Sequence, residues 1–222
     1  MKTLRIRWFA SALIVTGTIG FLAGAAFTED PAMDEEAMMK MMIELGTPGE
    51  HHKNLAKMAG DFDVAAKMWM SGPDPIESKA SSSSEMTLGG RYLTMNYKGS
   101  FQDMPFDGRG VMAYDNATET YLSVWYDNMS TGIMVSRGKL ADDGKTLTMT
   151  GHWDGPGGMK QEMRHVYVFG DDGSYALTGY HSQGGEEMKA MELTFSKAKK
   201  AAAPAAAANP RCCPKGSKGP GY

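Results

Sequence analysis

Histidines are the residues of this 222-residue chain best suited to chemistry near neutral pH. Three of them, His152, His165 and His181, lie in runs of alternating apolar residues, so a set that faced one cavity could bind a metal ion or haem. The alternation groups His165 and His181 with apolar neighbours but places His152 among threonines. We therefore favour ordinary hydrogen-bonded strand histidines, and we expect no metal site and no cofactor.

A second metal hypothesis combines the thioethers of Met33 and Met38 with the imidazoles of the pair His51-His52. Sulfur and imidazole ligands select Cu(I) in oxidising compartments. Helical spacing supports another interpretation, because Met38, Met41 and Met42 share one face that could pack on the folded domain or on a partner. We favour packing.

Acid-base catalysis would need carboxylates that converge in a cleft. Asp115 and Asp127 occupy equivalent places in two Tyr-Asp-Asn repeats, Tyr114–Asn116 and Tyr126–Asn128. An Asp-Asn pair directly after an aromatic strand end usually caps a turn. If the two repeats end successive strands of a meander, they lie at opposite ends of the fold, so we predict a turn role for both.

Nucleophilic catalysis has no recognisable motif in this sequence. The chain lacks Gly-x-Ser-x-Gly and His-Glu-x-x-His, and its two cysteines, Cys212 and Cys213, stand next to each other in the tail. We therefore predict no catalytic residue. If the chain does act on a bound ligand as a hydrolase or isomerase, Arg91, His165 and Asp127 are the groups to test first.

Aromatic side chains give the best binding candidate. Tyr121 and Trp125 share one face of a predicted strand, and further aromatics lie on other strands. Together with methionines they would suit a small hydrophobic or amphipathic ligand, although a completely filled interior is an alternative. The predicted ligand-binding residues are Trp69, Tyr92, Tyr97, Tyr121, Trp125, Trp153, His165 and His181.

The elements that must position these residues begin with a helical segment. Residues 34–59 read as helix with a break at Thr-Pro-Gly-Glu, and Asp34 is a good N-cap. From Gly60 onward, short runs rich in Tyr, Trp, Val, Leu, Met and Thr alternate with turn residues. We predict ten strands, at residues 61–70, 77–88, 91–102, 106–114, 120–127, 132–140, 146–153, 161–169, 174–182 and 188–197.

The short connections between these strands suit antiparallel hairpins. About ten antiparallel strands tend to close, so we predict an all-β fold, a single up-and-down barrel preceded by a short helical segment. Met163, His165, Tyr167 and Phe169 share one strand face, which fits a partly polar interior. The run Glu77–Glu85 offers no apolar face, so it is expected to be a loop or an edge-like strand at a gap.

The two ends of the chain differ from this domain. Lys2, Arg5 and Arg7 precede an apolar run at 8–27 that ends in small residues, so residues 1–26 are predicted to be a signal peptide, or an uncleaved membrane anchor. The rest would then be extracytoplasmic, with a helical segment at 27–59, the barrel at 60–197 and a disordered basic tail at 198–222. A net charge of -3 makes nucleic acid an unlikely partner.

Four phrases carry a family resemblance: "LAKMAGDFDVAAKMWM", "MTLGGRYLTMNYKGSFQDMPFDGRGVMAYDN", "YLSVWYDNMSTGIM" and "KAMELTFSK". Over residues 54–197 the chain resembles the bacterial family known as domain of unknown function 1579. The resemblance implies a calycin-like or lipocalin-like β domain with no established activity. In such barrels a Trp after a short helix plugs the closed end, and Phe62 stands in that place here.

Three functions remain open from the sequence. We favour noncatalytic binding of a small hydrophobic or amphipathic ligand inside the barrel. The alternatives are a hydrolase or isomerase acting on a ligand held there, and an interaction protein that binds copper or haem or contacts the cell envelope through its Met-rich helix and basic tail.

Overall fold

The structure is a computed structural model that describes residues 34–70, 72–183 and 185–199. The predicted helical segment forms two helices, α1 (Glu35–Gly46) and α2 (Glu50–Ala56), with the break where the sequence places it. Asp34 caps α1, because its carboxylate accepts a hydrogen bond from the backbone N–H of Ala37 at 2.7 Å. The proposed signal segment, Met33, and the tail with Cys212 and Cys213 lie outside the described residues.

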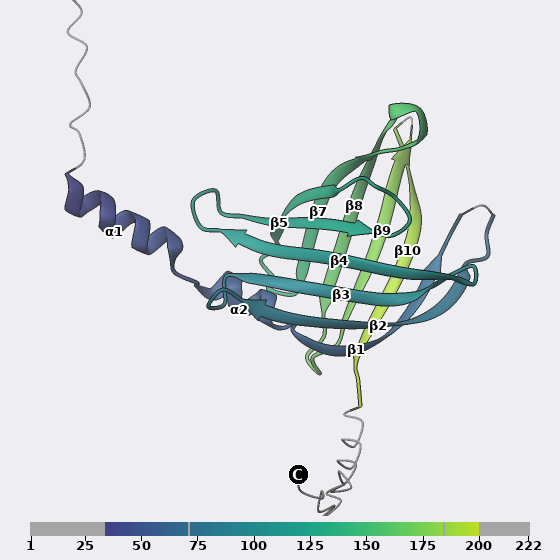
Figure 1. Ribbon diagram of the computed structural model, residues 1–222, viewed down its shortest axis with the longest axis horizontal. Coiled ribbons are helices and arrows are strands. Elements are labelled where there is room, and N and C mark those ends of the chain that lie inside the picture. The colour runs from purple at the N-terminus through teal and green to yellow at the C-terminus, as the bar shows by residue number, and fades with distance from the viewer. Residues whose placement is uncertain (1–33, 71, 184, 200–222) are drawn as a thin grey trace, which may run out of the picture.

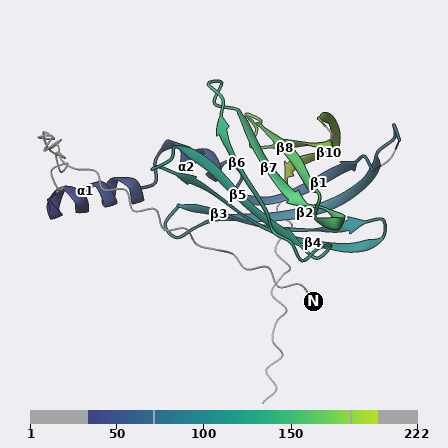
Figure 2. The same cartoon turned by 90° about the horizontal axis from the view of Figure 1, so that it is seen from above.

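Ten antiparallel strands follow and close into a barrel, as the sequence predicts (Figures 1 and 2). Each strand pairs with its neighbour in the chain, and the first strand pairs with the last. The strands are β1 (Gly60–Met68), β2 (Ile76–Thr87), β3 (Tyr92–Phe101), β4 (Met104–Asp115), β5 (Thr120–Asp127), β6 (Met134–Leu140), β7 (Thr146–Asp154), β8 (Lys160–Phe169), β9 (Tyr175–Gln183) and β10 (Glu186–Lys197).

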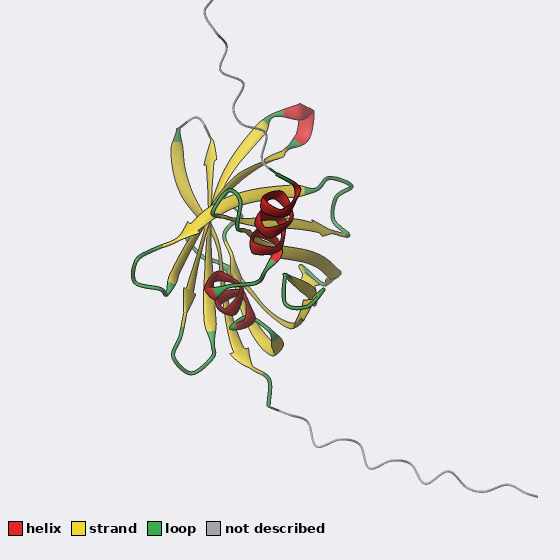
Figure 3. Cartoon of the chain, turned by 90° about the vertical axis from the view of Figure 1, so that its left-hand side faces the viewer, coloured by secondary structure: helices red, strands yellow, loops and turns green. Residues whose placement is uncertain are grey.

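Helix α2 covers one end of the barrel, which we call the closed end, and contacts β2, β3 and β4 (Figure 3). Leu55 of α2 and Met58 just after it are fully buried. Phe62 packs edge-on against Tyr175 with ring centroids 5.1 Å apart, and it belongs to the same core as Leu55. Phe62 is therefore buried near the closed end.

The serine-rich run of β2 decides between the two sequence-based expectations. It is a strand and not a loop, because β2 pairs with β1 from Ile76 to Ser84 and with β3 from Ser81 to Thr87, so it is edge-like only before Ser81. Ser82 and Ser84 are buried on its inner face. Ser82 lies between Phe62 of β1 and Tyr97 of β3 in the register, so a small side chain there leaves room for two large rings.

Helix α1 does not pack on the barrel, which overturns one of the two expectations for its methionines. None of its residues is buried, and it extends away from the strands (Figures 1 and 2). Its end is held by Asn116, whose side-chain amide donates to the carbonyl oxygens of Leu45 and Thr47 at 2.8 and 2.9 Å. No helix within the described ranges has both the length and the apolar character needed to cross a membrane.

Candidate functional site

The end of the barrel opposite α2, which we call the open end, carries a pocket of ≈ 350 Å³. This volume lies in the range of small-molecule sites. The pocket is formed where β1 ends, β8 begins, β9 ends and β10 begins. Its lining residues are Trp69, Met70, Gly72, Gln161, His181, Met188, Lys189 and Ala190.

A bulge in β10 shapes one wall of this pocket. The pairing of β10 with β9 is regular up to Lys189 and resumes at Met191, so Ala190 is the extra residue. The carbonyl oxygen of Ala190 accepts a hydrogen bond from the backbone N–H of Trp69 at 2.9 Å. The Trp69 indole donates to the carbonyl oxygen of Pro73 at 3.2 Å, and the Lys189 ammonium lies 4.1 Å above its ring. The bulge thus holds an aromatic wall in place.

Two histidines extend the site inward from the pocket. His181 lines the pocket itself, and the Trp153 ring lies beside it with centroids 6.2 Å apart. Deeper in the barrel, the side chain of His165 is 5% exposed. Burial, assisted by the nearby His181, lowers the pKa of His165 to about 4, and burial also lowers the pKa of His181. The buried imidazole of His165 is therefore neutral at pH 7.

The inner wall on the other side of the barrel presents Tyr97 and Trp125. Gly108 and Gly110 of β4 make room for the Trp125 indole, because a Cβ on Gly108 would lie 2.3 Å from its ring. The indole nitrogen donates to the carboxylate of Asp127 at 3.0 Å, and the Tyr97 ring packs edge-on at 6.3 Å. Both aromatics therefore lie on the half of the inner wall nearest the open end.

Polar groups are also buried along this wall. Ser123 of β5 and Ser136 of β6 lie directly opposite each other and are buried. Ser84 of β2 is 6% exposed, and its hydroxyl is the single buried side-chain oxygen or nitrogen without a hydrogen-bond partner in the described residues. Ser84 pairs with Gly60 at the closed end, away from the pocket, and an unsatisfied buried hydroxyl costs about 1–3 kcal/mol.

The structure separates the eight predicted ligand-binding residues into groups. Trp69 and His181 line the pocket, Trp153 lies beside His181, and His165 lies deeper in the barrel. Tyr97 and Trp125 lie across the barrel. The other two lie elsewhere, Tyr92 on the outer face with 39% exposure and Tyr121 buried at the closed end. The pocket residues that sequence reasoning missed are Met70, Gly72, Gln161, Met188, Lys189 and Ala190.

Tyr121 does not line the pocket and instead contacts α2. Its hydroxyl lies 3.0 Å from the Nδ1 atom of His51, which itself stacks on the Tyr114 ring at 4.0 Å. Burial raises the pKa of Tyr121 to about 12. The next residue, His52, accepts the backbone N–H of Gly49 at 3.0 Å and so caps α2. These interactions fasten α2 to the barrel.

The groups considered for catalysis do not converge. Arg91 lies in the turn between β2 and β3 at the closed end, whereas Asp127 ends β5 at the open end. Asp115 accepts hydrogen bonds from the Ala117 N–H and the Thr118 hydroxyl, and Asp127 accepts one from the Met129 N–H. The two aspartates thus cap turns at opposite ends of the barrel, which confirms the turn interpretation.

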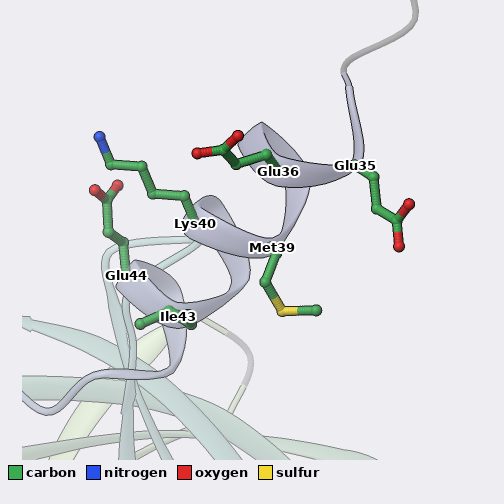
Figure 4. Close-up of a pocket in the computed structure, with 6 residues that line it drawn as sticks. All are labelled: Glu35, Glu36, Met39, Lys40, Ile43 and Glu44. Atoms are coloured by element: carbon green, nitrogen blue, oxygen red, sulfur yellow. The ribbon is translucent and has the colours of Figure 1, made fainter.

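The residues of the metal hypotheses drawn from the sequence are also separated in the structure. His152 lies on the outer face of β7, away from His165. Throughout the part of the chain that the structure describes, no three His, Cys, Asp or Glu side chains come together as a metal site. A surface depression beside α1 is lined by Glu35, Glu36, Met39, Lys40, Ile43 and Glu44 (Figure 4). All six belong to that one helix, so the depression has no opposing wall.

Comparisons with known proteins concern the barrel. The family model described as Protein of unknown function (DUF1579) matches residues 47–197, which include α2 and all ten strands. The fold is similar to the crystal structure of Rv2717c from M. tuberculosis, with a TM-score of 0.49 and 11% sequence identity. That similarity covers 69% of this chain and 100% of the other. No curated protein matches the sequence.

Proposed function

This chain belongs to the family described as Protein of unknown function (DUF1579), and from the geometry of its barrel we propose that it is an exported, noncatalytic protein that binds a small amphipathic molecule at the open end. The observation that carries the proposal is the pocket of ≈ 350 Å³, which combines aromatic, thioether and polar surfaces. Sites of this composition bind small molecules by burying their apolar part and orienting their polar part.

The lining indicates the chemical class of the ligand. Trp69, Met70 and Met188 offer an apolar surface, whereas Gln161 and His181 offer neutral hydrogen-bonding groups. The charge of Lys189 is already engaged, because its ammonium lies over Trp69 and donates to a carboxylate oxygen of Glu192 at 2.8 Å. A ligand with an apolar body and an uncharged polar end therefore fits better than an anion.

A neutral fluorescent probe tests the proposal. The purified full chain is titrated with N-phenyl-1-naphthylamine, and we expect a saturable rise in probe fluorescence at one molecule per chain. Trp69→Ala removes the aromatic wall without opening the core, so we expect it to weaken binding about tenfold or more, the size of an effect of 1–3 kcal/mol. Tyr126→Ala is the matched control, since this aromatic is exposed on the outer face of β5. Equal weakening by both substitutions, or unsaturable uptake, would contradict the proposal.

The export part of the proposal is supported by the basic residues at positions 2, 5 and 7, the apolar run and the small residues that follow it. We expect cell fractionation of a bacterial producer to recover the chain outside the cytoplasm, with a mature N-terminus near Ala25 or Ala26. Recovery of a cytoplasmic chain that still begins at Met1 would contradict export.

A further inference from the structure

Two histidines and two methionines share one patch of the inner wall. On β8, Met163 and His165 are two residues apart and both face inward. The register places His181 of β9 opposite Met163, and it places Gly179 opposite both His165 and Met191 of β10. Side chains at opposed positions have Cβ atoms about 4.5–5.5 Å apart, and diagonal neighbours are about 7–8 Å apart. We call His165, His181, Met163 and Met191 the histidine-methionine cluster.

Gly179 lies between two members of this cluster, Met191 and His165, and lets them approach each other. A Cβ on Gly179 would lie 2.7 Å from both the Cγ and the Cε atom of Met191 and 3.3 Å from the Cδ2 atom of His165. The thioether arm of Met191 and the imidazole of His165 therefore both occupy the space over the glycine. Met163 and His165 are almost entirely buried, so this part of the cluster is shielded from water.

The donor set has a defined metal preference. Neutral imidazole is the form that binds metal ions, and thioether sulfur is a soft ligand that favours Cu(I) over harder divalent ions. We propose that the histidine-methionine cluster is a Cu(I) site with two nitrogen and two sulfur donors, a role that goes beyond the binding of an amphipathic molecule. The cluster contains two histidines and no Asp, Glu or Cys. It therefore differs from metal sites built of three or more His, Cys, Asp or Glu side chains, which the described residues do not form.

The open-end pocket supplies the entry path that such a site needs. His181 belongs to the cluster and also lines the pocket. Met188 lies opposite His181 on β10, is 55% exposed and lines the same pocket. An incoming Cu(I) ion would meet this thioether and then His181 before it reached the buried members.

A competition titration tests the proposal. The full chain carries Cys212→Ser and Cys213→Ser, because tail thiolates would bind Cu(I) themselves. Under anaerobic conditions, bicinchoninate competes for Cu(I), and we expect one ion to be retained per chain. His165→Gln with His181→Gln is expected to weaken retention about a hundredfold or more, and Met163→Leu with Met191→Leu about tenfold. Met and Leu have similar volumes, so the second pair preserves packing.

Matched controls separate loss of ligands from loss of structure. Met112→Leu changes a buried methionine on β4, and His152→Gln changes a histidine on the outer face of β7, so both should leave Cu(I) retention unchanged. Circular dichroism checks that every variant folds. X-ray absorption at the copper edge should show nitrogen and sulfur neighbours, with sulfur lost in the Met163→Leu, Met191→Leu protein.

Two results would overturn the proposal, namely no retained Cu(I) or undiminished retention in both cluster variants. The second would place the metal elsewhere, for example on the methionines of α1. The outcome is distinguishable from that of the proposed function, because Trp69→Ala should weaken probe binding while it leaves Cu(I) retention intact.

Discussion

The buried imidazole of His165 makes stability depend on pH in a definite direction. Its pKa falls from 6.5 to about 4 in the folded chain, chiefly because burial penalises the imidazolium, with His181 adding repulsion. Between these two values the unfolded chain binds a proton that the folded chain does not bind. The free energy of unfolding must therefore decrease as the pH falls from about 6.5 towards 4.

We expect His165 alone to account for a loss on the order of 3 kcal/mol by pH 4, since each unit of pKa shift corresponds to about 1.4 kcal/mol. His165→Gln should remove this part of the pH dependence, whereas His152→Gln on the outer face should keep it. Urea unfolding of the three proteins at pH 7 and pH 4.5 measures the difference. Identical pH slopes for His165→Gln and the parent chain would show that the imidazole is not buried as described.

Gly179 has a steric role that a single methyl group tests. In Gly179→Ala the new Cβ would lie 2.7 Å from Met191, so the methionine and the neighbouring imidazole must move. Overpacking of this kind typically destabilises by about 1–3 kcal/mol. Gly132→Ala is the control, because the nearest atom to its new Cβ is the Ser130 hydroxyl at 4.0 Å. Urea midpoints should fall for Gly179→Ala and stay close to the parent value for the control.

At the scale of elements, α2 is the short helix that covers the closed end. Leu55→Ala empties a fully buried position, so we expect a loss of about 2–5 kcal/mol in the free energy of unfolding. Lys53→Ala, on the exposed side of the same helix, removes a surface ion pair with Glu50 and should leave the midpoint nearly unchanged. Equal effects in chemical unfolding would mean that α2 does not cover the core.

Alternation and turn chemistry predicted most of these elements. All ten strands were expected from sequence within two residues at each end, and so were the first helix and the break, whereas α2 ends at Ala56, three residues before the predicted end. The inner face of β8, from Met163 to Phe169, was also predicted, because side chains on the buried face of a strand recur at every second residue. β2 escaped this reasoning because its inner face is made of serines. They are buried opposite Phe62 and Tyr97, and that pairing depends on register between strands.

The pocket itself could not be predicted from alternation. Counting back from Met191 in steps of two places Lys189 on the inner face and Met188 on the outer face. The extra residue Ala190 reverses this assignment, so Met188 reaches the pocket. Alternation was also insufficient at Tyr92. The sequence does not tell which of two adjacent apolar residues, Tyr92 or Leu93, faces inward. The structure buries Leu93.

For the whole molecule, closure depends on the pairing of the first strand with the last. β1 and β10 pair from Phe62 with Lys197 to Met68 with Met191, and the Lys197 ammonium donates to the carbonyl oxygen of Ala59 at 2.7 Å. A chain that ends at Gly185 lacks β10 and exposes two strand edges. We expect it to lose cooperative unfolding, whereas a chain that ends at Lys199 keeps it. Thermal scans by circular dichroism distinguish the two, and a cooperative transition in the shorter chain would refute the dependence on closure.

The bulge at Ala190 has a further consequence for how the entrance can vary between related chains. Loss of this one residue would leave the partners of Lys189 and Met191 on β9 as they are, so the same side chains would still face inward. The loop that follows β1 would nevertheless have to repack, because Lys189, whose ammonium now lies over the Trp69 ring, would take the place of Ala190 beside the Trp69 backbone. A deletion of one codon could therefore loosen the rim while sparing the interior. The shape of the pocket entrance can therefore change while the packing of the barrel interior stays the same.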